Sequence, residues 1–358
     1  MYRWMLILML CIPRGLYGAA LPWQEVQSAA VGGHVEAQRM LGQFYLEGEG
    51  GVEKDPKRAG YWLEKAARGG DGLAQSLYGY LLSQGLGRAV DEEGAVYWYR
   101  LAAAQGEPKA MIALALKYRA GLGVKRDARQ AVQLFRQAAE LGDGRAQYYL
   151  GDHLARGEGI PRDGAQAAQW YERAARSGSL LAALALGQML EQGKGVQADG
   201  AMARHWYEQA AQGGHAEAQF RLALMWEEGR GGVRDVAVAV DWYRKAAAQG
   251  DTRGAVNLGY LLAHGVGAPR DEQQAVALYT QAAQGGSATA MYNLGVRYSM
   301  GSGVKQDLIA AYQWFHLAWQ QHYKGADAAR EQVAMQLKGA QIAQARAQAA
   351  QWLSDKGR

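Results

Sequence analysis

The chain has 358 residues, with 39 Lys and Arg against 34 Asp and Glu, which gives a formal net charge of +5 at pH 7. Its positive charges are scattered singly, without the concentrated stripe that binding to nucleic acid requires, so that function is disfavoured. The only cysteine, Cys11, lies within the first twenty residues, so the rest of the chain offers no disulfide, cysteine-based zinc site or cysteine nucleophile.

Residues 1–20 have the layout of a secretory signal. They begin with a basic residue, Arg3, continue with an apolar run over 4–12, and end in small residues at 18–20. The apolar run is too short to span a bilayer as a stable helix. We therefore expect cleavage after Ala20 and a periplasmic or secreted protein with no integral membrane segment. The open alternative is an exposed N-terminal tail on a cytosolic protein.

Residues 21–35 predict a single helix ahead of the main array. The sequence Ser28-Ala29-Ala30, followed after one residue by two glycines, echoes the end of the next helical unit. This segment is interpreted as a half-repeat that caps the N-terminal edge.

Residues 36–322 repeat with a period of 36 residues, and an Asp marks each of the eight units. An Ala follows each Asp after four residues, and large apolar or aromatic residues follow after seven and eight. These positions trace one face of a helix that begins at the Asp, whose carboxylate can accept the free backbone N–H groups of the first turn. The Asp residues are Asp55, Asp91, Asp127, Asp163, Asp199, Asp235, Asp271 and Asp307.

Each of these second helices is expected to end at a glycine, because a left-handed residue after the helix is unstrained only in glycine. The first seven end glycines are Gly70, Gly106, Gly142, Gly178, Gly214, Gly250 and Gly286.

A first helix precedes each second helix and is joined to it by a Gly-x-Gly loop. Its pattern places Leu or Tyr four residues after a small residue, and a Gly or Ala comes next, as in Leu186-Gly187. Glycine inside a helix costs about 1 kcal/mol relative to alanine. Its recurrence therefore predicts that an aromatic side chain of a neighbouring helix packs closely against it.

The combined pattern, with its GxGV loop and its Trp-Tyr-x-x-Ala-Ala helix, resembles the Sel-one-like repeat (SLR), a relative of the tetratricopeptide repeat. The resemblance implies an all-α, right-handed α/α superhelix, or solenoid, of about eight 36-residue helix-loop-helix repeats with terminal capping helices. It also implies a non-catalytic adaptor that binds a partner protein or peptide on its concave face, in bacteria often in the periplasm or at the host interface. No cofactor is implied, and a monomer is expected.

Residues 323–358 contain two further Ala- and Gln-rich helical stretches and a short tail. The last unit of a repeat array leaves an apolar face uncovered unless a different segment packs on it. These stretches are therefore predicted to be the C-terminal cap.

Signals for catalysis are few. Ser302 and Lys305 have the Ser-x-x-Lys spacing of penicillin-recognising enzymes, but they lie on a repeat loop, and the other motifs of those enzymes are missing. A cell-wall-related or penicillin-binding hydrolase using this pair is the alternative function. The seven histidines have no spacing typical of metal ligands, and one Asp per repeat lacks the oxygen cluster that calcium needs.

Partner recognition is expected where the repeats differ from one another. Two rows on the first helices, eight and four residues before the first Gly of each loop, vary most in chemistry. Since first helices line the concave surface in related superhelices, these rows should face a partner. The open alternative is an ordinary solvated face. The predicted binding residues are Lys117, Tyr149, His153, Arg156, Arg221, Asn257, Asn293 and Arg297.

Overall fold

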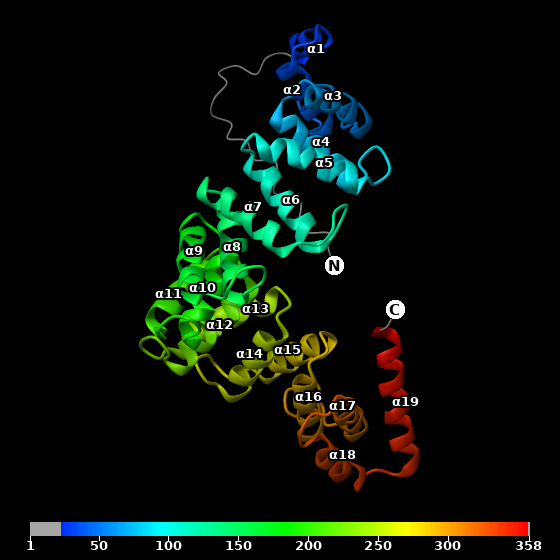
Figure 1. Cartoon of the computed structure of the whole chain (residues 1–358). Coiled ribbons are helices and arrows are strands. Elements are labelled where there is room, and N and C mark those ends of the chain that lie inside the picture. Colours follow the sequence, from blue (N-terminus) through cyan, green and yellow to red (C-terminus); the bar gives the residue numbers. More distant parts are fainter. Residues whose placement is uncertain (1–22, 357–358) are drawn as a thin grey trace. The chain divides into compact units, whose positions relative to one another are not determined.

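The computed structural model describes residues 23–356, and all secondary structure in this part of the chain is helical (Figure 1). The first helices of the eight repeats are α2 (Val35–Glu47), α4 (Gly72–Gln84), α6 (Pro108–Ala120), α8 (Gly144–Arg156), α10 (Leu180–Gln192), α12 (Ala216–Glu228), α14 (Thr252–His264) and α16 (Ala288–Met300). The second helices are α3 (Pro56–Arg68), α5 (Glu92–Ala104), α7 (Ala128–Glu140), α9 (Gly164–Arg176), α11 (Gly200–Gln212), α13 (Val236–Ala248), α15 (Glu272–Gln284) and α17 (Leu308–Gln320). The remaining helices are α1 (Trp23–Val31), α18 (Ala326–Ala334) and α19 (Gly339–Lys356).

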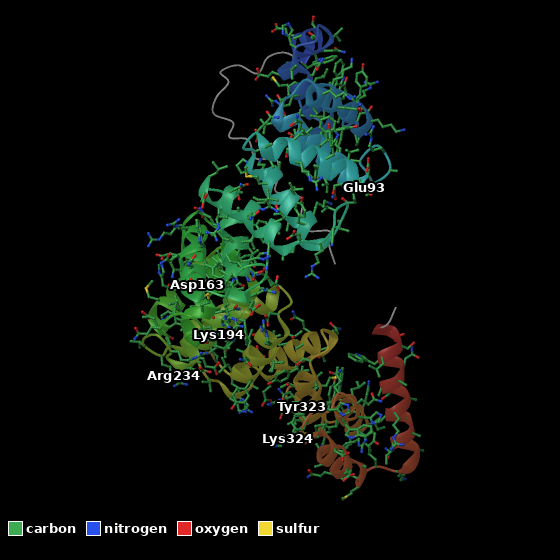
Figure 2. All side chains as sticks on the ribbon, viewed as in Figure 1. Glu93, Asp163, Lys194, Arg234, Tyr323 and Lys324 are labelled. Carbon is green, nitrogen blue, oxygen red and sulfur yellow. The ribbon has the colours of Figure 1, made fainter. Side chains whose placement is uncertain are left out.

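The repeated Asp begins every second helix, as predicted. Asp127, for example, accepts the backbone N–H groups of Arg129 and Gln130 at 2.9 and 3.1 Å, and Asp163, which Figure 2 labels, accepts that of Gln166 at 2.9 Å. The glycines predicted to end the first seven second helices all have positive φ, between 87° and 93°. Local sequence therefore sets both ends of each second helix.

Close packing between the two helices of a repeat occurs at the small residue of the first helix. A Cβ atom at Gly151 would lie 2.8 Å from the ring of Tyr171, and one at Gly187 would lie 2.7 Å from Tyr207. The tyrosine rings fill the space that a side chain on the glycine would occupy. The prediction of a close approach is confirmed.

The Gly-x-Gly loop of a repeat also touches the repeat before it. The second glycine of a loop packs against the start of the preceding second helix, so that a Cβ atom at Gly231 would collide with the carbonyl oxygen of Gly200. The equivalent Gly123 lies in the same way against the carbonyl of Glu92. Because these glycines also have positive φ, both space and backbone conformation require them.

The array divides into two compact units, with the boundary between Ser179 and Leu180. Unit 1 contains α1 to α9 and unit 2 contains α10 to α19. In unit 1 every helix packs against the next one in sequence. The same is true in unit 2 for each consecutive pair from α10 and α11 to α17 and α18.

Additional helices cover the two ends of the array. In unit 1, α1 packs on α2. In unit 2, α18 and α19 both pack on α17, where the ring of Trp352 lies 5.6 Å from that of Trp314. No helix among residues 23–356 combines the length and the apolar character that a membrane span needs. The predicted signal over 1–20 lies outside the described residues.

Candidate functional site

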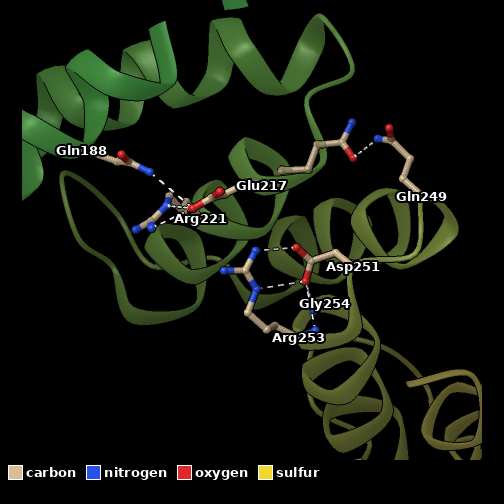
Figure 3. A network of polar contacts seen from close by, with 8 residues as sticks. Gln188, Glu217, Arg221, Gln249, Asp251, Arg253 and Gly254 are labelled. Atoms are coloured by element: carbon tan, nitrogen blue, oxygen red, sulfur yellow. Dashed lines mark hydrogen bonds and ion pairs between the residues drawn. The ribbon is translucent and has the colours of Figure 1, made fainter. Parts of the chain in front are cut away.

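A network of charged and polar side chains joins successive first helices of unit 2 (Figure 3). Gln188 of α10 donates a hydrogen bond to the carboxylate of Glu217 of α12 at 3.3 Å. The guanidinium of Arg221, one turn further along α12, donates two hydrogen bonds to the same carboxylate at 2.9 and 2.8 Å. These three half-buried side chains form a row across the partly exposed side of two neighbouring first helices.

Glu191 of α10 connects this row to the interior. It accepts a hydrogen bond from the hydroxyl of Tyr207 at 2.6 Å, lies 3.5 Å from Nη1 of Arg221, and pairs with Arg230. Burial and the hydrogen bond to Glu191 both raise the pKa of Tyr207. The tyrosine therefore remains protonated and acts as a donor, while the carboxylate orients Arg221.

The next repeat has a related arrangement. The hydroxyl of Tyr243 donates to Glu227 at 2.6 Å and accepts a hydrogen bond from the side chain of Asn257 at 3.0 Å. Burial is the main cause that raises the pKa of Tyr243, and the hydrogen bond to Glu227 adds to it. Asn257 thus takes the place that Arg221 has one repeat earlier.

Arg253 extends the polar surface onto α14. Its guanidinium donates to Asp251 at 2.6 Å and lies 4.3 Å from the ring centroid of Phe220 on α12. Burial raises the pKa of Asp251, but hydrogen bonds from Arg253 and from backbone N–H groups outweigh that effect and leave it lowered. Tyr260 follows two turns later on α14 with 53 % of its surface exposed.

Three of the predicted residues of unit 1 make defined contacts there. Lys117 is mostly covered, with 12 % of its side chain exposed, and its ammonium group pairs with Glu92 at 2.5 Å. Tyr149 stacks on Phe135 with ring centroids 4.9 Å apart. Arg156 is exposed and pairs with Asp152 at 2.8 Å.

The structure places His153 in the interior, so its side chain does not face a partner. Its exposed fraction is 0 %, Nδ1 lies 2.9 Å from the carbonyl oxygen of Glu158, and the buried Nε2 has no partner within the described residues. The rest of its row, four residues before each loop, is largely buried as well, as shown by Leu81 and Met225. This row packs against the preceding repeat, a contact that distance from the loop does not reveal.

Arg297 and Asn293 occupy the last repeat. Arg297 has 13 % of its side chain exposed, and its Nη1 lies 4.0 Å from Glu272 of the preceding second helix. This pair repeats the geometry of Lys117 and Glu92, because both cations lie at the same repeat position. Asn293 is half-buried.

Sequence reasoning missed Glu217 and Arg253, which lie on the first turn of their helices. Neither belongs to the two rows chosen from the sequence, yet both join the network around Arg221 and Phe220. The spacing of Glu217 and Arg221, four residues apart on a helix, is the signal that could have identified the pair.

Ser302 and Lys305 share the loop between α16 and α17. The backbone N–H of Ser302 donates to the carbonyl of Arg297 at 3.0 Å, which is the contact that the repeat loop makes elsewhere. Among residues 23–356 its hydroxyl has no hydrogen-bond partner that could act as a base. Within the same part of the chain, no three His, Cys, Asp or Glu side chains group as metal ligands.

Comparison with known proteins identifies the repeat. The family model of the Sel1 repeat matches eight consecutive segments, 35–71, 72–107, 108–143, 144–179, 180–215, 216–251, 252–287 and 288–322. No curated protein gives a significant match.

Two solved structures resemble the chain over most of its length. A Sel1 repeat protein from Oxalobacter formigenes is 29 % identical with a TM-score of 0.66, and the match covers 88 % of this chain and 91 % of that one. A protective antigen present in uropathogenic Escherichia coli strains, which displays an SLR fold, is 29 % identical with a TM-score of 0.57, and the match covers 92 % and 86 %.

Proposed function

Because the chain belongs to the Sel1 repeat family, whose members are generally protein-interaction scaffolds and generally non-catalytic, we propose that it is a non-catalytic scaffold. It binds a protein or peptide partner on the exposed side of its first helices.

The polar row on α10, α12 and α14 is the observation that carries this proposal. It offers acceptors on Glu217 and donors on Arg221 and Arg253, with the ring of Phe220 beside Arg253 and the exposed Tyr260 two turns further along α14. An extended segment presents alternating backbone donors and acceptors together with side chains, so a surface of this mixed kind suits it. Repeat positions that form the core are unavailable for recognition because they are buried.

The ion pairs of the row favour binding because they hold its side chains in place before a partner arrives. Arg221 is fixed by Glu217 and Glu191, and Arg253 by Asp251. Ordering a long side chain at an interface costs about 0.5–1.5 kcal/mol. Side chains that are already ordered reduce that cost.

The alternative, a hydrolase using Ser302 and Lys305, is supported only by their spacing. The scaffold proposal predicts that a penicillin probe does not acylate the protein. Acylation that disappears in a Ser302→Ala variant would contradict it.

We also propose that the protein is exported to the periplasm or secreted. The support is the basic, apolar and small-residue pattern of residues 1–20. Mass spectrometry of the protein from its native cells tests this proposal. A mature chain that begins at Leu21 supports export with cleavage, and a retained Met1 contradicts it.

Site-specific photocrosslinking in the native cells tests the binding surface. A benzoylphenylalanine replaces Tyr260 on α14 or, as the matched control, Tyr61 on the second helix α3, and both tyrosines are 53 % exposed. The proposal predicts one discrete crosslinked protein from position 260 and none from position 61. Equal products from both positions, or a product from 61 alone, would overturn the assignment to the first helices.

A further inference from the structure

Two open apolar cavities lie at equivalent places in the two units. The cavity in unit 1 has a volume of about 660 Å³ and lies where α5, α6 and α7 meet. The cavity in unit 2 has a volume of about 320 Å³ and lies where α13, α14 and α15 meet. Both are in the size range of sites that hold a side chain or a small molecule.

The same repeat positions line both cavities. Alanines and leucines form the walls, and an arginine lies at the rim. The lining residues include Arg100, Ala103, Leu114 and Leu134 in unit 1, and Arg244, Ala247, Leu258 and Leu278 four repeats further along in unit 2.

Leu134 and Leu278 explain why the cavities occur in these repeats. They occupy the position seven residues after the repeated Asp, and the six other repeats have a tryptophan there. An indole ring is much larger than a leucine side chain. An aromatic side chain typically buries roughly 150–250 Å² of surface. The two leucines therefore leave space that tryptophan fills elsewhere.

Trp98 shows where the indole lies when it is present. Its ring packs edge-on against the ring of Tyr78, with centroids 5.5 Å apart. Tyr78 holds the repeat position of Leu114 and Leu258, which line the two cavities. The cavities are thus the sites of a missing indole ring.

An arginine lies at the rim of each cavity. Arg100 is exposed and donates to the hydroxyl of Tyr118 at 3.0 Å, and Arg244 is 53 % exposed and pairs with Asp241 at 2.8 Å. Glu140 also reaches the rim in unit 1. In the second helices that border a tryptophan-filled site, the position of these arginines is held by Glu64, Arg136, Glu172, Glu208 and Thr280.

An arginine is therefore present at both open cavities and at one of those five filled sites. A carboxylate beside the bound ring would complement this charge.

We infer that the cavities at Leu134 and Leu278 are docking sites for an aromatic side chain, above all tryptophan, of a protein segment with an Asp or Glu beside it. The ring takes the place of the indole that the other repeats supply themselves, and the carboxylate pairs with Arg100 or Arg244. Each site lies where two second helices meet the first helix between them, and none of its lining residues belongs to the row around Arg221. If no peptide binds at these sites, the proposed binding surface on the first helices is not contradicted.

Fluorine NMR with a synthetic peptide tests the inference on the full chain. The probe is acetyl-Ala-Asp-Trp-Glu-Ala-amide with a fluorinated indole, and the wild type is expected to bind two equivalents. Leu134→Trp and Leu278→Trp should each remove one equivalent, because the new side chain fills its own cavity. The double variant should weaken binding about tenfold or more. Peptide binding to the double variant with the affinity of the wild type, or no binding to the wild type, would overturn the inference.

A reverse variant guards against loss of binding through misfolding. Trp170→Leu empties the same position in another repeat and should create a third binding equivalent. Thermal unfolding should show that the two leucine-to-tryptophan variants stay folded, since six repeats already have tryptophan there. If Trp170→Leu adds no binding site while the protein remains folded, the absence of the indole cannot be what creates the cavities.

Two further probes separate the parts of the inference. A peptide with Lys in place of Asp and Glu should bind more weakly, and the difference should disappear in an Arg100→Ala, Arg244→Ala double variant. Equal affinity of the two peptides would overturn the role of the arginines. Free indole that binds as tightly as the acidic peptide would show a site for a small aromatic molecule and overturn the protein segment as the occupant.

Discussion

Units 1 and 2 bury the same repeat positions in their apolar cores, but they differ in the polar contacts between successive repeats. The alanines four residues after the repeated Asp are fully buried in both units, as Ala95 and Ala239 illustrate. In unit 2, Glu191 accepts a hydrogen bond from Tyr207 and lies close to Arg221, whereas Glu227 accepts one from Tyr243, whose hydroxyl in turn accepts from Asn257.

The equivalent positions in unit 1 are held by other residues, and the contacts change with them. Ser83 accepts a hydrogen bond from Lys117 at 2.7 Å, and Ala155 has no side-chain acceptor that it could offer to Tyr171. The repeat pattern therefore fixes how each unit packs, whereas individual residues determine how neighbouring first helices are tied together.

The largest expected effect concerns a feature common to both units. Gly231→Ala in unit 2 should lower the free energy of unfolding by about 3 kcal/mol, because alanine would adopt positive φ and its Cβ would collide with the carbonyl oxygen of Gly200. Gly123→Ala in unit 1 should cost a similar amount for the same reason. Chemical denaturation measures both losses.

Gly214→Ala is the matched control for the collision. Gly214 also has positive φ, at 90°, but a Cβ atom there would meet nothing within 4 Å. Only the backbone strain remains, about 1–2 kcal/mol. A loss at Gly214 as large as that at Gly231 would show that the close contact between the loop and the preceding second helix contributes nothing.

The next effect is specific to unit 2. Glu191→Ala should reduce stability by about 2 kcal/mol, because it leaves the hydroxyl of Tyr207 and the guanidinium of Arg221 without their shared acceptor. Glu172→Ala in unit 1 is the control, since Glu172 is 40 % exposed and its pair with Arg176 should contribute less than about 0.5 kcal/mol. Equal losses in urea unfolding would remove the distinction between the units.

A smaller effect is expected when unit 1 is given the residue of unit 2. Lys117→Met should change stability by less than about 1 kcal/mol, because the side chain of its partner Glu92 is 27 % exposed and water can solvate the carboxylate that remains. Met189 and Met225 already occupy this position in unit 2. A loss well above that of Glu191→Ala would mean that the pair with Glu92 is a major stabilising contact.

The smallest effect is a dependence on pH at the C-terminal cap. His316 lies on α17, and burial together with the charges of Arg330 and Arg346 lowers its pKa. The unfolded chain then binds this proton more readily than the folded one, so stability should fall as the pH drops from about 7 through the lowered pKa.

His316→Gln should remove that part of the pH dependence, measured as the unfolding midpoint at about pH 7 and about pH 5. Other titrating groups contribute equally to both proteins. An unchanged difference between the two pH values in the variant would contradict a role for His316.

The sequence was sufficient to predict the repeat family, the all-helical fold and the ends of the second helices. Those features depend on local chemistry, such as the carboxylate of Asp127 at a helix start or the positive φ of Gly214 at a helix end. Each can be inferred from a few adjacent residues, and eight copies reinforce the inference.

The surface was less predictable because it depends on which neighbour covers a position. The sequence predicts that His153 faces a partner, but its row is buried against the preceding repeat. Lys117, in the same row, reaches Glu92 of its own preceding repeat. Arg253 was overlooked because its contact with Phe220 joins two repeats. Contacts between repeats leave no mark on the 36-residue period, so only the three-dimensional arrangement shows them.

Hydrogen–deuterium exchange, with and without the protein that crosslinks at Tyr260, tests the proposed surface most directly. If the first helices of unit 2 form the binding surface, exchange should slow in α12 and α14 when the partner is added, while α11 keeps its rate. Slower exchange confined to second helices, with α12 and α14 unchanged, would contradict the account.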